Sequence, residues 1–332
     1  MRSIDPEIVA IVDAERLGTI SEGWTGTALT LVEAGGLTAV MAPPMRKPDL
    51  LTRLTGNTAR IVAPLVDRQR LLEHLLTRHD VLPLRPGAGL GPADAADFLK
   101  INKALLRAAL NDCVGKVQYQ LTISWDPSAA LGRFASMTGD TAHALATSAE
   151  AMRRSLSRDF AGRLDGAVLD RIDQPIDGIE TVLNAVLLVE RNATAALDQA
   201  LEEIDAVWSE GLRLRLVGPL PPLSFTLVVA RPVDRAERQA AERLLGLQSE
   251  SSPPVIDRAF RARAAEAHPD HGGDGTDLAA LAEARDLLKR LASVQGETEP
   301  DRTVFLASVH RDGNGQAESA ERVAEGLHKE AS

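Results

Sequence analysis

The sequence predicts an α+β fold with two small α/β lobes, the second of them ferredoxin-like, followed by a C-terminal helical hairpin. Short apolar runs bounded by Gly and Pro predict strands before Pro232, and apolar residues at helical spacing predict helices between them. Leu212, Leu214 and Leu216 alternate with arginines, which is typical of a half-buried strand. After Pro232 the chain is rich in Ala, Arg and Glu, which favours helices.

These patterns divide the chain into five expected segments. An N-terminal α+β domain is expected over residues 1–140, and a helical connector between the lobes over 141–168. The ferredoxin-like domain is expected over 169–232, because two strands, a helix and two more strands follow one another within about 60 residues. Residues 233–293 are predicted to be helical, and 294–332 form a polar, partly disordered tail.

The N-terminal domain contains short runs rich in aliphatic and β-branched residues, which we expect to form strands. These runs cover residues 8–12, 27–33, 37–42, 81–84 and 117–125. Gly35 and Gly36 separate the second run from the third and favour a hairpin turn. One helix is predicted over 67–79 and a single longer helix from Pro92 to Gly115, because apolar residues recur there at helical spacing.

The later elements follow from the same two periodicities. Strands are expected over 172–176, 181–190, 212–216, 225–230 and 303–309. Helices are expected over 141–164, 192–211, 236–245, 255–267 and 277–291. The second of these helices has the clearest apolar stripe, because Leu197, Leu201, Ile204 and Trp208 recur every three or four residues.

The composition argues against several classes of protein. A net charge of −10 argues against nucleic-acid binding, because such proteins concentrate positive charge on one surface. No apolar run has the length of a membrane span, and residues 1–13 lack the basic start and apolar core of a signal peptide. We therefore expect a cytoplasmic protein without nucleic-acid or membrane partners. The single cysteine, Cys113, is expected to be a small buried residue.

The sequence lacks motifs that would indicate an enzyme. It contains no phosphate-binding glycine loop and no Gly-x-Ser-x-Gly elbow. The glycine-rich stretch 87–91 follows a predicted strand, but its spacing does not fit a dinucleotide site and favours a loop. His268, Asp270 and His271 are too few ligands for a closed zinc site. We predict no catalytic residue, no metal and no cofactor.

The first family-like motif lies at residues 80–88, DVLPLRPGA, and is followed by a helix and a strand that ends at Trp125. This order resembles the GvpL/GvpF family of gas vesicle proteins. That family usually has an apolar strand, a proline, an apolar residue and then Arg-Phe-Gly-Thr. Leu84, Arg85 and Gly87 match the pattern, whereas proline and alanine replace the family's phenylalanine and threonine.

A second motif with the same resemblance lies at residues 218–225, GPLPPLSF, where the family often has Gly-Pro-Trp-Pro-Pro-Tyr-Ser-Phe. The matching residues are Gly218, Pro219, Pro221, Pro222, Ser224 and Phe225. Two interpretations are open, because proline fixes φ and stiffens the chain. The motif is either a rigid turn between paired strands or an exposed rigid platform for a partner. The resemblance extends over roughly residues 4–232.

The stretch AHPDHGG, residues 267–273, lies between two predicted amphipathic helices and resembles the His-Pro-Asp loop of DnaJ-type J-domains. Pro269 disfavours a helical conformation for His268 and so predicts a loop. Three arginines add positive charge to the preceding helix. The residues that the resemblance implies for docking a DnaK-type ATPase are His268, Pro269, Asp270, Arg258, Arg261 and Arg263. The alternative is a helix-ending turn beside a solvated helix face.

Together these resemblances imply a gas vesicle assembly factor or a minor structural component of the vesicle. The implied partners are the shell protein GvpA, other gas vesicle accessory proteins and, through the J-like segment, a DnaK-type chaperone. The expected location is the cytoplasm, at the gas vesicle. The alternative function is that of a general J-domain co-chaperone, in which residues 1–232 bind assorted clients.

Overall fold

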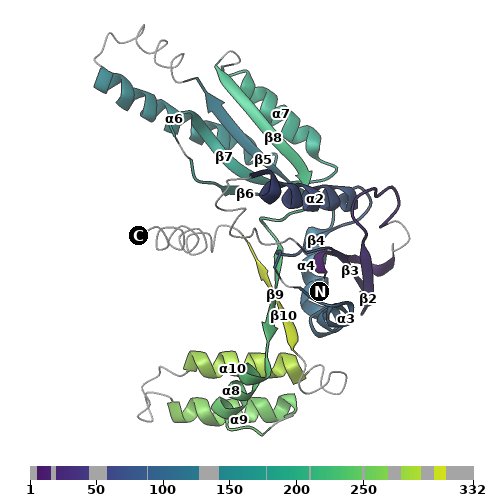
Figure 1. Cartoon of the computed structure of the whole chain (residues 1–332). Coiled ribbons are helices and arrows are strands. Elements are labelled where there is room, and N and C mark those ends of the chain that lie inside the picture. Colours follow the sequence, from purple (N-terminus) through teal and green to yellow (C-terminus); the bar gives the residue numbers. More distant parts are fainter. Residues whose placement is uncertain are drawn as a thin grey trace. The chain divides into compact units, whose positions relative to one another are not determined.

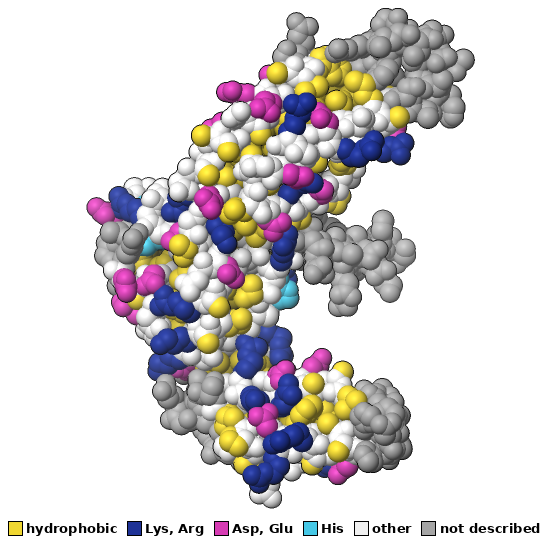
Figure 2. All heavy atoms as spheres, turned by 180° about the vertical axis from the view of Figure 1, so that it is seen from behind, with side chains coloured by type: hydrophobic (Ala, Val, Ile, Leu, Met, Phe, Trp, Pro, Cys, Tyr) yellow, Lys and Arg dark blue, Asp and Glu magenta, His cyan; other side chains and the backbone are white. Residues whose placement is uncertain are grey.

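The computed structural model is a mixed α+β fold with antiparallel sheets and helices, as the sequence predicts (Figure 1). It describes residues 6–15, 20–44, 58–87, 89–126, 142–176, 178–208, 211–248, 251–267, 278–292 and 303–311. On the face shown in Figure 2, basic and acidic side chains are interspersed. This mixed surface gives no reason to expect a strongly acidic or strongly basic partner on that face.

The chain forms two compact units, and each combines separated stretches of sequence. Unit 1 comprises residues 1–65, 84–108 and 228–308, and unit 2 comprises 66–83, 109–227 and 309–332. The sequence predicted contiguous domains instead. Periodicity shows where an element lies along the chain, but it does not show which distant element it pairs with.

The N-terminal sheet has the strand order β2-β3-β1-β4. Its strands are β1 (Glu7–Asp13), β2 (Thr30–Ala34), β3 (Leu37–Ala42) and the short β4 (Leu82–Pro83). β2 and β3 form an antiparallel hairpin. Gly35 and Gly36 have φ angles of 62° and 80°, which suit a tight hairpin turn and confirm the predicted one. The central strands β1 and β3 are buried almost throughout and provide the core of this sheet.

Among the described residues before Lys116, the α-helices are α2 (Thr58–Leu76), α3 (Pro92–Ile101) and α4 (Lys103–Cys113). α2 begins earlier than the predicted start at residue 67. The prediction of a single helix from Pro92 to Gly115 is also wrong, because the helix is interrupted at Asn102. Asn102 leaves the helical conformation with φ −104° and ψ 13°, and its side-chain amide donates to the carbonyl oxygen of Phe98 at 2.8 Å. α3 packs against β2 and β3.

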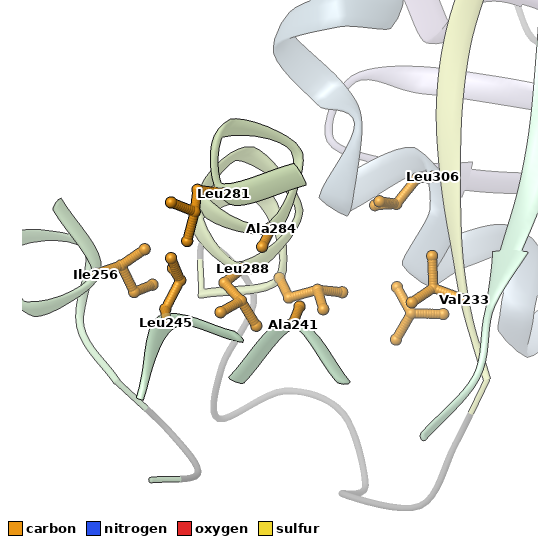
Figure 3. Close-up of a cluster of buried hydrophobic side chains, with 10 residues drawn as sticks. Val233, Ala241, Leu245, Ile256, Leu281, Ala284, Leu288 and Leu306 are labelled. Atoms are coloured by element: carbon orange, nitrogen blue, oxygen red, sulfur yellow. The ribbon is translucent and has the colours of Figure 1, made fainter. Parts of the chain in front are cut away.

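From Leu227 to Arg311, the described residues form three helices and a two-stranded sheet. They are α8 (Arg235–Leu245), α9 (Pro253–Ala267), α10 (Leu278–Ala292), β9 (Leu227–Val233) and β10 (Val304–His310). Asp234 caps α8 by accepting the backbone N–H of Glu237 at 2.8 Å. β10 pairs with β9, which confirms the strand predicted over 303–309. The apolar core of this part (Figure 3) contains Val233, Ala241, Leu245, Ile256, Leu281, Ala284, Leu288, Leu291, Val304 and Leu306.

Unit 2 is built on an antiparallel sheet with the order β6-β7-β5-β8. Its strands are β5 (Lys116–Trp125), β6 (Asp170–Asp173), β7 (Thr181–Glu190) and β8 (Leu212–Leu220). With α6 (Ala142–Leu164) and α7 (Thr194–Asp205), the element order is β-α-β-β-α-β. A ferredoxin-like sandwich has this order of elements.

The strands of this sheet differ from those predicted for residues 169–232. β5 was expected in the N-terminal domain but lies between β7 and β8, whereas residues 225–230 contribute to β9 and pair with β10. The pattern of burial gives the physical reason. β5 and β7 are the more buried strands and occupy the middle, whereas β8 exposes Arg213 and Arg215 and suits an edge.

The helix α6 was predicted to connect two lobes, but it is part of the unit 2 core. It packs on β7 and on α7. Phe160 and Leu164 on its inner face have no exposed surface. Arg153 donates to the carbonyl oxygen of Thr181 at 3.5 Å, which also joins the helix to β7.

Candidate partner-binding site

The first family-like motif, residues 80–88, contains a buried residue, Leu84, followed by an exposed loop. Leu84 is buried, and its N–H donates to the carbonyl oxygen of Val9 at 3.1 Å. The N–H of Arg85 donates to the carbonyl oxygen of Val228 at 2.8 Å. The side chain of Arg85 and the following Gly87 are exposed. Leu84 therefore anchors the loop, and Arg85 to Gly87 can meet a partner.

The second motif begins with a bulge in β8. The pairing of β8 with β5 shifts register between Gln118 and Gln120, opposite Gly218 and Pro219. Gly218 has a φ of 145°, and a Cβ atom there would lie 2.8 Å from the carbonyl oxygen of Gln118. Glycine is therefore required at this close approach, and Pro219 brings no N–H that would need a partner in the bulge. Both residues are exposed.

The rest of the second motif is held inside the fold. Its buried residues are Pro221, Pro222, Ser224 and Phe225. The N–H of Ser224 donates to Oε1 of Gln118 at 2.8 Å, and the N–H of Phe225 donates to the carbonyl oxygen of Pro222 at 3.1 Å. The guanidinium of Arg311 lies 5.6 Å from the centroid of the Phe225 ring. These contacts favour the rigid-turn interpretation, with only the bulge turned to solvent.

The three arginines expected to dock a DnaK-type ATPase lie on α9, and all three are exposed. Arg261 donates to the carbonyl oxygen of Asp257 at 3.2 Å, and Arg263 forms an ion pair with Glu266 at 3.1 Å. Arg258 lies one turn before Arg261 on the same helix. The remaining predicted docking residues lie outside the described residues, directly after the end of α9: His268, Pro269 and Asp270.

α9 is held against α10 by polar contacts as well as by the apolar core. Asp257 and Lys289 form an ion pair at 3.0 Å. The guanidinium of Arg285 lies 4.5 Å from the centroid of the Phe260 ring, within the range of a cation–π interaction. These contacts thus fix α9 and α10 against each other.

Cys113 lies on α4 and is 1% exposed, as the sequence predicts. Burial raises the pKa of this thiol to about 12, against the opposing effect of a hydrogen bond with Thr226. The group is therefore protonated near neutral pH and is not a nucleophile. Within the described ranges, no cluster of His, Cys, Asp and Glu could hold a metal ion. In the same part of the chain, no helix is long and apolar enough to cross a membrane.

Two buried polar residues organise the fold and were missed from the sequence. Gln118 on β5 holds the second motif through its side-chain oxygen. Asn102 is 3% exposed and bonds to two residues of β10. No local signal marks either residue, because a polar residue in an amphipathic segment is ordinarily expected to face solvent.

Comparison with known proteins identifies what the chain resembles. A family model described as gas vesicle synthesis protein GvpL/GvpF matches residues 8–226. The crystal structure of the gas vesicle protein GvpF from Anabaena sp. PCC7120 aligns with a TM-score of 0.53 at 19% identity, over 66% of this chain and 94% of that one. GvpF from Microcystis aeruginosa aligns with a TM-score of 0.50 at 17% identity, over 66% and 98% of the two chains. A search of curated proteins gave no match.

Proposed function

Because this chain belongs to the gas vesicle synthesis protein GvpL/GvpF family, we propose that it is an assembly factor or minor structural component of gas vesicles. In this role it binds the shell protein GvpA and other accessory proteins of the vesicle. The role is one of binding at the vesicle and involves no catalysis. The observation that carries the proposal is the family match over residues 8–226, which includes both motifs.

A physical argument supports the need for such a protein. A shell that keeps water out is made of very apolar subunits, and apolar surfaces that are exposed before assembly aggregate. A binding protein with a rigid framework can cover a subunit and release it at the growing shell. The exposed Arg85 loop and the Gly218 bulge are the parts of the family motifs that can meet such a subunit.

Deletion of the gene tests the proposed function. We expect a deletion strain to form no gas vesicles, or only a few small ones, because unprotected shell subunits aggregate before they assemble. Electron microscopy of whole cells measures the number and length of vesicles, and expression of the full chain from a plasmid is the control. Normal vesicle numbers in the deletion strain would contradict the proposal.

We further propose that α9 and the residues after it recruit a DnaK-type chaperone. The support is the set of exposed arginines on α9, together with the resemblance of residues 267–273 to the J-domain loop. A chaperone ATPase brought to a bound shell subunit would keep that subunit from aggregating. This step concerns residues beyond the family match, so it can fail while the first proposal stands.

The recruitment step predicts a histidine-dependent effect on ATP hydrolysis. Addition of the full chain to a purified DnaK-type ATPase should raise its steady-state hydrolysis rate, and His268→Gln should return it to the basal rate. His310→Gln, which changes an exposed histidine on β10, should keep the full stimulation. Equal rates with and without the wild-type chain would overturn recruitment. Stimulation combined with normal vesicles in the deletion strain would favour the general co-chaperone instead.

A further inference from the structure

β8 forms an open edge of the unit 2 sheet. It is the last strand in the order β6-β7-β5-β8, so one side of it pairs with β5, and the other side has no strand beside it among the described residues (Figure 1). The pairing with β5 is regular from Leu212 to Val217 and then shifts at the bulge of Gly218. The regular stretch spans about 20 Å, which is long enough for a further strand to pair with it.

The backbone groups that are free at this edge belong to two leucines. The N–H of Trp125 donates at 2.9 Å to the residue that precedes β7, so the next residue back, Ser124, turns its backbone groups toward β8. Its partner there is Arg213, whose carbonyl oxygen also accepts from Oγ of Ser124 at 3.4 Å. Because these directions alternate along a strand, the N–H and C=O groups of Leu214 and Leu216 point away from β5. Within the described part of the chain, these groups have no partner.

The side chains of the same two leucines make one face of the edge apolar. Trp125 packs edge-on against Trp208, which follows α7, with the ring centroids 6.5 Å apart. Every second residue of β5, counted from Trp125, therefore lies on the face of the sheet that packs against the helices. Leu214 and Leu216 pair with such residues and share this helix face. Leu214 is half-buried and Leu216 is 37% exposed, so an apolar residue of an added strand would cover both further.

The opposite face of the edge is basic. Arg213 and Arg215 pair with Ser124 and Thr122 of β5, which places them on the face away from the helices. Both arginines are exposed, and neither side chain forms an ion pair or a hydrogen bond with a described residue. This includes Asp126, the acidic residue that directly follows β5. The two positive charges of this basic face therefore have no carboxylate of their own and are available to a partner.

The two faces together select the chemistry of an added strand. Acidic residues on the basic face would lie beside Arg213 and Arg215, and opposite charges on neighbouring strands stabilise a sheet. The helix face disfavours acidic residues, because the pKa of Tyr119 on that face is raised by burial and by the negative charge of Asp198 on α7. A second copy of β8 is also disfavoured, because it would bring two more arginines to the basic face.

We propose that the free edge of β8 binds an extended segment of a partner protein in which acidic and apolar residues alternate. The acidic side chains lie beside Arg213 and Arg215, the apolar side chains lie beside Leu214 and Leu216, and the backbone of the segment bonds to the free groups of the leucines. The inference goes beyond the proposed function, because strand addition at β8 needs neither the Arg85 loop nor a gas vesicle protein. The deletion strain tests the proposed function separately, so either can fail alone.

The probe for this site is a fluorescein-labelled peptide of about eight residues, slightly longer than the regular part of β8. Glutamate and valine alternate along it. A second probe has lysine in place of glutamate, and a third has the composition of the first with all glutamates in one half. Fluorescence anisotropy with the full chain should show that the alternating glutamate probe binds about tenfold more tightly than either of the others. Equal affinities for the three probes would overturn the proposal.

Paired arginine substitutions test whether the probe binds at β8. The double variant Arg213→Gln/Arg215→Gln should bind the alternating glutamate probe about tenfold more weakly, because it removes the charges of the basic face. The matched control is Arg154→Gln/Arg158→Gln, which removes two exposed arginines from α6 of the same unit and should leave affinity within about twofold. Circular dichroism should show that both variants are folded. Equal losses from the two double variants would contradict binding at this edge.

Hydrogen exchange tests strand addition itself. The N–H groups of Leu214 and Leu216 gain acceptors only when a strand pairs with the edge. Amide-resolved NMR should therefore show exchange at these two residues that is about tenfold slower with saturating glutamate probe than without it. Binding without this slowing would mean that the probe meets the arginines from outside the sheet, and strand addition would be wrong.

Discussion

Replacement of Asn102 by alanine should lower the free energy of unfolding of unit 1 by about 3 kcal/mol, because it leaves buried backbone groups without partners. The Asn102 side chain uses its full hydrogen-bonding capacity. Nδ2 donates to the carbonyl oxygens of Phe98 at 2.8 Å and Phe305 at 3.0 Å. Oδ1 accepts from the N–H of Ala307 at 2.8 Å and from Arg290 at 2.9 Å. An alanine replaces none of these contacts.

The effect should be concentrated at β10. Ala307 is 1% exposed, so its N–H would lose its partner away from solvent. Hydrogen exchange of a peptide covering 303–311 should therefore be faster in the variant than in the wild-type chain, and urea denaturation should give the change in unfolding free energy. Asn111→Ala is the matched control, because this residue is an exposed asparagine on α4 and should change stability by no more than about 0.5 kcal/mol. Similar exchange rates in the two variants would rule out this role for Asn102.

Asn102 also shows why local sequence patterns predict only part of this fold. Periodicity alone predicted one helix from Pro92, because Phe98, Ile101 and Leu105 fit one apolar stripe. Besides Phe98, the Asn102 side chain bonds to Phe305 and Ala307, which are 203 and 205 residues further along the chain. A side chain whose partners are so distant leaves no trace in its own neighbourhood.

Strand positions were predictable where a strand and its partner are close in sequence. The β2–β3 hairpin follows from two apolar runs around Gly35 and Gly36, and its register is set by that turn. β5 was also predicted as a strand, but it was assigned to the wrong sheet. Its neighbours β7 and β8 come after the long helix α6 in the sequence. Which strands pair with β5 depends on how deeply each whole strand is buried, and local periodicity does not show this.

The candidate site was also predictable only in part. The resemblance located Leu84, Arg85 and Gly218, because the family pattern preserves residue order. It could not show that Leu84 is an anchor while Arg85 is exposed, since that difference comes from hydrogen bonds to Val9 and Val228.

Replacement of Gly218 by alanine should destabilise unit 2 by at least about 2 kcal/mol, through two separate effects. The φ of 145° is a conformation that residues with a side chain rarely adopt. The added Cβ would also lie 2.8 Å from the carbonyl oxygen of Gln118 and 2.7 Å from Cδ1 of Tyr119. The carbonyl belongs to the β5 backbone, so relief requires movement of a central strand and of the bulge that leads into the second motif.

Gly87→Ala separates the two effects. Gly87 also has a positive φ, at 118°, but a Cβ atom there would have no neighbour within 4 Å among the described residues. This variant should therefore show the backbone cost alone, about 1–3 kcal/mol. Gly162→Ala, at an exposed position in the last turn of α6 with no atom within 4 Å of an added Cβ among the described residues, should be neutral or stabilising by up to about 1 kcal/mol. If Gly218→Ala costs no more than Gly87→Ala, the close approach between β8 and β5 is not what requires glycine there. A larger cost at Gly218 means that the motif's first glycine is required by the packing of the sheet, whatever partner the bulge meets.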